Sequence, residues 1–166
     1  MDAVKLREIQ EPLKAKYLED PGSALITLKA RARAGEGITC KIETGRSLAE
    51  AGLHPATGGD GLSVCSGDML LEALAACAGV TLKAVATSIG FDLQDAHIEV
   101  EGDLDFRGTL SVDKNAPVGF QAIRLQFHLQ TGETSDKIAT LIKLTERFCV
   151  VYQTLRHTNT IEVKVS

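Results

Sequence analysis

One segment limits the possible folds more than any other. Residues 68–89, DMLLEALAACAGVTLKAVATSI, read as a helix that is apolar on nearly every side. Ser66 and Asp68 favour the start of a helix, and Gly90 favours its end. Such a helix needs cover on several faces, so we expect it to be central and buried. Its Ala and Gly residues permit the close approach of a second helix.

The same segment is a poor candidate for a membrane span. Its most apolar part, Met69 to Val85, is short for a bilayer and is interrupted by Glu72 and Lys83. The first residues, MDAVKLREIQ, lack the basic and then apolar run of a signal peptide. We therefore expect a cytoplasmic protein without a membrane partner, whose thiols stay mostly reduced.

Charge and composition argue against a nucleic-acid partner. The 166 residues, about one domain's worth, include 18 basic and 22 acidic residues, which gives a net charge of −4. That balance lacks the basic footprint of a nucleic-acid-binding protein. Aromatic residues make up 4% of the chain and Trp is absent, so a base-stacking surface is not expected.

Apolar and polar residues alternate in several segments, which is the pattern of half-buried strands. These segments lie at 24–33, 38–43, 98–106, 123–129 and 161–165. A long Gly-rich connection at 44–67 precedes the apolar helix, and residues 136–148 form a second, amphipathic helix. The predicted order is β-β-α-β-β-α-β, which favours an α+β fold with antiparallel pairing.

Four cysteines are the candidate reactive residues: Cys40, Cys65, Cys77 and Cys149. They form no C-x-x-C pair and have no His at zinc-ligand spacing, so a structural zinc site is not expected. From the residues alone, each thiol could be inert or reactive. Cys40 lies on the apolar face of a strand, and Cys77 lies too deep in its helix for the N-terminal dipole to act strongly. Cys149 follows the second helix, at a point where that helix ends or restarts.

Other motifs that carry chemistry are missing from the sequence. The run Gly58–Gly61 lacks the G-K-[ST] ending of a phosphate-binding loop, and no Ser-His-Asp or H-E-x-x-H pattern appears. The residues therefore imply neither a metal nor an organic cofactor.

Two cysteine motifs resemble those of the OsmC/Ohr family, the osmotically inducible and organic hydroperoxide resistance proteins. DMLLEALAACAGVTLKAVATSIG is similar to the central helix of that family, which carries Ala-Ala-Cys after a Leu-rich turn. ERFCVVYQTLRHTNTIEVKV is similar to its second motif, and TGRSLAEAGLHPATGGDG to its Gly-Gly loop. The resemblance spans residues 24–166 as a single domain, and residues 1–23 form an N-terminal extension.

The resemblance implies a fold, an activity and partners. The fold would be OsmC-like, in an intertwined homodimer with both central helices buried at its heart. The activity would be a thiol peroxidase that reduces organic or other hydroperoxides. Cys77 would be the peroxidatic residue, and Cys149 would resolve its sulfenic acid as a disulfide, which a dithiol reductant then clears.

The sequence departs from the family pattern in two places. Gly67 stands where the family has the Glu that orients an Arg, and Asp68 is the nearest acidic residue. Val150 stands where a Pro commonly follows the second Cys. The activating Arg stays open among Arg46, Arg33 and Arg31. These departures support an alternative, a non-catalytic OsmC-like protein that binds a small apolar ligand or a partner protein.

Overall fold

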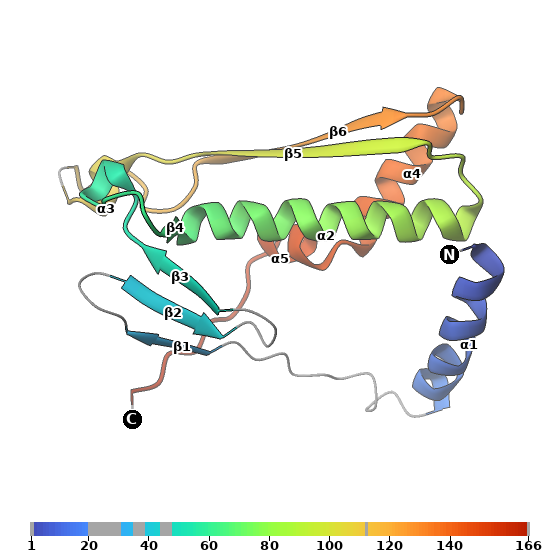
Figure 1. Cartoon of the computed structure of the whole chain (residues 1–166), viewed down its shortest axis with the longest axis horizontal. Coiled ribbons are helices and arrows are strands. Elements are labelled where there is room, and N and C mark those ends of the chain that lie inside the picture. Colours follow the sequence, from blue (N-terminus) through green and yellow to red (C-terminus); the bar gives the residue numbers. More distant parts are fainter. Residues whose placement is uncertain (1, 20–30, 35–38, 44–47, 112, 166) are drawn as a thin grey trace. The chain divides into compact units, whose positions relative to one another are not determined.

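The structure, a computed structural model, describes residues 2–19, 31–34, 39–43, 48–111 and 113–165. Its elements, shown in Figure 1, are α1 (Ala3–Glu19), β1 (Arg31–Ala34), β2 (Thr39–Glu43), β3 (Leu48–Gly52), β4 (Val64–Cys65), α2 (Ser66–Ile89), β5 (Asp95–Asp103), α3 (Phe106–Thr109), β6 (Ala122–Gln130), α4 (Ser135–Phe148) and α5 (Val150–Arg156). The fold is α+β, with antiparallel strand pairs and one long central helix, as the sequence predicts.

Contacts divide the chain into two compact units. The first consists of Met1–Leu13, Ala73–Glu99 and Gln126–Ser166, and the second of Lys14–Glu72 and Val100–Leu125. Each unit therefore combines segments that are far apart in the sequence, because α2, β5 and β6 run through both.

The core of the first unit forms between α2 and α4. Leu82, Val85 and Ala86 of α2 pack with Phe91 and with Leu141 of α4. Half-buried side chains complete this cluster: Leu93, Ala96, Ile98, Phe127, Leu129, Ile138, Ile142 and Leu144. Gly90 ends α2 in the left-handed conformation, with φ of 65°, as predicted for a C-terminal glycine.

Burial of α2 is one-sided in the single chain. Its buried residues form a stripe at helical spacing: Leu74, Ala78, Leu82, Val85 and Ala86. Val80, on another side of the helix, is 73% exposed. The expectation of a helix buried on nearly every side is therefore wrong for one chain by itself. By length and composition α2 could also cross a bilayer, but core helices of soluble proteins meet the same criterion.

Strands β5 and β6 pair with each other and confirm the predicted alternation. The predicted strand 98–106 is wrong at its end, because β5 stops at Asp103 and Asp105 caps the helix α3 that begins at Phe106. In each strand, every second residue is half-buried and the residues between are exposed. In the second unit, Arg124 of β6 bonds to Glu101 and Asp103 of β5 on the exposed face. These ion pairs join the two strands at the surface.

The second unit holds a sheet of four strands in the order β1-β2-β3-β4. Strand β2 pairs antiparallel with β1 and with β3, and its Cys40 lies opposite Ala34 and Ala51. The prediction of an irregular connection over 44–67 is thus wrong for β3 and β4. Strand β3 reads LAEAG, and Ala and Gly have low strand propensity, so its strand character comes from pairing with β2.

The last predicted strand does not form in the described part of the chain. Residues 158–165 follow α5 without helix or strand, and Ile161, Val163 and Val165 are almost fully exposed. A strand needs a partner for its backbone N–H and C=O groups. The alternating apolar pattern of this segment therefore remains unpaired in one chain.

Candidate functional site

The two predicted redox cysteines meet in the first unit. Cys77 lies in the middle of α2 and is half-buried. Cys149 lies between α4 and α5 and is 1% exposed. Both are free thiols, and each side chain shifts the pKa of the other, so the two lie within interaction range. Residues 72 positions apart in the sequence thus influence each other's pKa.

A break in the helix brings Cys149 to this place. Its backbone is extended, with φ of −73° and ψ of 108°, so α4 ends and α5 begins at this residue. The Cys149 N–H donates to Thr145 of α4, and its C=O accepts from Gln153 of α5. The first N–H groups of a helix have no partner within that helix. At the start of α5, some of these groups bond to the cysteine sulfurs instead.

The surroundings of Cys77 favour its thiolate. Burial raises the pKa of this thiol, but hydrogen bonds from the Val151 N–H, the Cys149 thiol, the Thr81 hydroxyl and the Val150 N–H outweigh burial. The pKa of Cys77 therefore lies below its ordinary value. At a given pH, more of this thiol is in the nucleophilic thiolate form than in an unperturbed cysteine.

The pKa of Cys149 is shifted in the opposite direction, above its ordinary value. Burial is the largest cause that raises its pKa, and the neighbouring Cys77 adds to it through a hydrogen bond and through charge. The N–H groups of Tyr152 and Val151 oppose this effect without overcoming it. The pair therefore consists of a thiol with a lowered pKa beside one with a raised pKa.

The side chains of the arginines predicted to activate Cys77 lie outside what the structure describes. Arg46 lies outside the described residues. Arg31 and Arg33 lie in β1, of which only the backbone is described. Among the described residues, no guanidinium contributes to the lowered pKa of Cys77. The sequence analysis missed the N–H groups of α5, although the expected helix restart after Cys149 was their signal.

Asp68 lies in the second unit, where it lines a cavity of about 360 Å³ together with His54, Cys65 and Phe106. His54 stacks on Phe106, with ring centroids 4.8 Å apart. Gly67 lines the same cavity, and a Cβ atom there would lie 3.6 Å from the Cys65 sulfur and 3.5 Å from Phe120. The position at which the family has a carboxylate is thus surrounded here by apolar side chains and a thiol.

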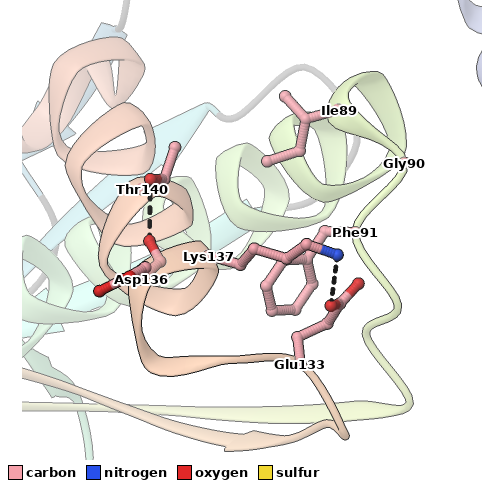
Figure 2. Close-up of a pocket in the computed structure, with 7 residues that line it drawn as sticks. All are labelled: Ile89, Gly90, Phe91, Glu133, Asp136, Lys137 and Thr140. Atoms are coloured by element: carbon pink, nitrogen blue, oxygen red, sulfur yellow. Dashed lines mark hydrogen bonds and ion pairs between the residues drawn. The ribbon is translucent and has the colours of Figure 1, made fainter.

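The first unit contains two further cavities of interest. One, of about 420 Å³, is mostly apolar and is lined by Gln10, Val80, Thr81, Ala84, Val85, Ser88, Ile89, Leu144 and Phe148. The other, of about 220 Å³, lies between the end of α2 and the start of α4. Figure 2 shows Lys137 and Glu133 bonded to each other across it, at 2.6 Å. Neither cysteine of the pair lines this smaller cavity, so it is not the candidate site.

Within the described part of the chain, no three His, Cys, Asp or Glu side chains are grouped to hold a metal ion. The candidate site consists of the two thiols and the groups of α5 and α2 that act on the pKa of Cys77.

Fold and site together define a small α+β protein with two neighbouring free thiols of unequal acidity. The sequence model of OsmC-like proteins matches residues 58–164, and the chain belongs to this family. No curated protein matches it in a sequence comparison.

Solved structures share the fold. An OsmC-like protein from Mycoplasma pneumoniae is 16% identical, with a TM-score of 0.67 over 79% of this chain and 88% of that one. An organic hydroperoxide resistance protein OsmC from Legionella pneumophila is 20% identical, with a TM-score of 0.62 over 80% and 90%. The organic hydroperoxide resistance protein OhrB of Bacillus subtilis is 21% identical, with a TM-score of 0.52 over 79% and 91%. At these identities the likeness concerns the fold.

Proposed function

We propose that this protein is a thiol peroxidase that reduces organic or other hydroperoxides in the cytoplasm. The observation that supports this most is that Cys77 and Cys149 lie within interaction range, with a lowered pKa for Cys77 and a raised pKa for the buried Cys149. Organic hydroperoxide resistance proteins are among the similar structures, which supports the same substrate class.

The first chemical step needs the Cys77 thiolate. Its sulfur attacks the terminal oxygen of the hydroperoxide, so that an S–O bond forms and the O–O bond breaks. The electron pair leaves with the alkoxide, which takes a proton and becomes an alcohol. Cys77 is then a sulfenic acid.

Cys149 completes the cycle. The Cys77 thiolate raises the pKa of Cys149, and this effect ends when Cys77 becomes a neutral sulfenic acid. The N–H groups of Tyr152 and Val151, which lower that pKa, remain. The Cys149 sulfur then displaces water from the sulfenic acid, and a disulfide forms. A dithiol reductant restores both thiols by exchange.

Thiol counting tests this function. One equivalent of cumene hydroperoxide added to the reduced protein should remove two free thiols and give a Cys77–Cys149 peptide in mass spectrometry. In the Cys149→Ser variant, dimedone should trap a sulfenic acid on Cys77. Cys65→Ser is the matched control and should lose two thiols as the wild type does. If the wild type kept all its thiols, the peroxidase would be excluded.

A non-catalytic role in binding a small apolar ligand is the second candidate. The mostly apolar cavity of about 420 Å³ beside α2 and the glycine at position 67 favour it. Absence of peroxide-dependent thiol loss, together with binding of an apolar fluorescent probe, would support this reading.

We also propose a homodimer. In the first unit, α2 exposes Val80 and the C-terminal segment exposes Ile161, Val163 and Val165. The Ala and Gly residues of α2 permit close approach of a second helix, and the unpaired segment has the pattern of a strand. Light scattering after gel filtration measures this state directly.

A further inference from the structure

The second unit contains a cavity that the proposed peroxidase does not use. Its volume is about 360 Å³, near the lower end of the range for ligand pockets in proteins. All of the described residues that line it belong to this unit. Neither Cys77 nor Cys149 is among them, so the cavity is not part of the thiol pair's site.

Two of the rings that line the cavity are held in place by local contacts. His54 stacks on Phe106, with ring centroids 4.8 Å apart and planes inclined by 18°. The Nδ1 atom of His54 accepts a hydrogen bond from the Ala56 N–H at 3.0 Å, which orients the imidazole and means that the ring is uncharged. Asp105 caps the helix that begins at Phe106, because its carboxylate accepts from the Arg107 N–H. The stack is therefore formed before any ligand binds.

A glycine leaves room inside this cavity. A Cβ atom at Gly67 would lie 3.5 Å from the Phe120 ring and 3.6 Å from the Cys65 sulfur. These are ordinary van der Waals distances, so the position has space for a side chain and holds none. The Cys65 thiol is free and half-buried, and it borders this space. A reagent that modifies Cys65 therefore reports whether the cavity is occupied.

The ionised side chains that line the cavity are acidic. They are Asp68 at the start of α2 and Asp103 at the end of β5, and the described lining contains neither Lys nor Arg. Arg124 binds the Asp103 carboxylate and offsets its charge. Asp68 is exposed, and within the described part of the chain its carboxylate has no hydrogen bond or ion pair. The cavity thus combines half-buried aromatic side chains with one carboxylate whose charge has no partner.

We propose that this cavity binds a small amine that carries an apolar or aromatic group. The apolar group enters beside Phe106 and Phe120, and the ammonium stays at the exposed side with the Asp68 carboxylate. Aromatic rings attract cations, which adds to the attraction of the carboxylate. An anionic ligand would meet the charge of Asp68 without a Lys or Arg in the described lining to bind it. This site does not depend on the proposed peroxidase.

Protection of Cys65 from iodoacetamide tests the proposal with two matched probes. Benzylamine is a cation at neutral pH, and benzyl alcohol is a neutral molecule of nearly the same shape. At about ten times its Kd, benzylamine leaves about one tenth of the cavities free, so Cys65 should react about tenfold more slowly. Benzyl alcohol at the same concentration should protect far less. Cys77, read in the same digest, should react at an unchanged rate, because it does not line this cavity.

Asp68→Asn removes the charge at an exposed position and keeps the side-chain shape. The variant should bind benzylamine about twofold to fivefold more weakly, as expected for an exposed ion pair, and should bind benzyl alcohol as the wild type does. Glu72→Gln is the matched control, since it removes an exposed charge from the same helix and Glu72 does not line the cavity. Its benzylamine protection should equal that of the wild type.

Three results would each overturn the amine site: no protection by benzylamine, equal protection by the two probes, or an Asp68→Asn variant that binds benzylamine as the wild type does. The peroxidase is tested separately by its thiol count. A wild type that benzylamine protects at Cys65, but that keeps all its thiols with peroxide, would exclude the peroxidase and leave the amine site standing.

Discussion

Cys77 and Cys149 carry the same functional group in different surroundings. The pKa of Cys77 is lowered because the hydrogen bonds to its sulfur outweigh burial. The pKa of Cys149 is raised because burial and the neighbouring Cys77 outweigh its backbone donors. The two pKa values therefore differ because backbone N–H groups of α5 and the Thr81 side chain of α2 act on Cys77, whereas burial dominates at Cys149.

The lowered pKa of Cys77 predicts how its reactivity depends on pH. The folded state holds the thiolate to lower pH than the unfolded chain does, because the unfolded chain lacks the donors around the sulfur. Alkylation of Cys77 should therefore persist on acidification in native buffer and fall at a higher pH in urea. Peptide-resolved mass spectrometry measures both curves. Coincident curves would show that folding does not activate this thiol.

Individual residues also show where sequence reasoning ends. The motif around Cys77 and the motif around Cys149 are local, so a resemblance to a family can single out both residues from the sequence. The donors of α5 are backbone N–H groups, for which the sequence offered only an indirect signal, the helix restart expected after Cys149. The same limit applies to Gly67, whose departure from the family was visible, whereas its neighbours Cys65, Leu104 and Phe120 come together only in the fold.

At the scale of elements, the start of α5 is the feature that acts on the site. The Val150 N–H donates to the Cys77 sulfur, and the Val150 side chain is 68% exposed. Proline has no N–H and is tolerated at the first position of a helix. Position 150 thus offers a way to remove one donor with little change in packing.

Val150→Pro should move the alkylation midpoint of Cys77 to higher pH, with the rate below the midpoint lower by about threefold to tenfold. Val150→Ala keeps the N–H and is the control that should match the wild type. Iodoacetamide kinetics across a pH series make the comparison. Equal profiles for the two variants would mean that this N–H does not stabilise the thiolate.

Strand β5 makes a prediction about stability. A Cβ atom at Gly102 would lie 2.5 Å from the Phe120 ring, whereas one at Gly132 would meet nothing within 4 Å. Gly102→Ala should lower the free energy of unfolding by about 1–3 kcal/mol, because the ring must move. Gly132→Ala should leave it nearly unchanged. Urea titration measures both, and equal stabilities would show that Phe120 adapts without cost.

The elements that the sequence predicted well are those with a strong internal period. Strands β5 and β6 alternate over nine residues each, and α2 extends over 24 residues to a terminal glycine. Strand β3 was missed because its Ala-rich sequence has no strand signal of its own and depends on pairing with β2. Segment 161–165 alternates apolar and polar residues as a strand does, but it has no partner strand in one chain. The alternation alone was therefore not sufficient to predict a strand.

At the scale of the whole molecule, the first unit exposes apolar residues that a second copy of the chain would cover. Val80 on α2 is 73% exposed and Val163 is 84% exposed. Exposed apolar residues are common when scattered singly, but the C-terminal segment alternates three of them with polar residues, as a strand in a sheet does. A second copy that covered α2 and paired with this segment would satisfy both features.

Val80→Glu tests this interpretation. If two copies bury position 80, the variant places a charge without a partner in the interface, which costs several kcal/mol. A loss of about 3 kcal/mol weakens the dimer by more than a hundredfold, so the variant should be monomeric at micromolar concentration. Leu62→Glu is the control, because Leu62 is an 88% exposed apolar residue of the second unit. It should keep the wild-type mass in light scattering. A wild type that is itself monomeric, or a Val80→Glu variant that stays dimeric, would place α2 outside any interface between copies.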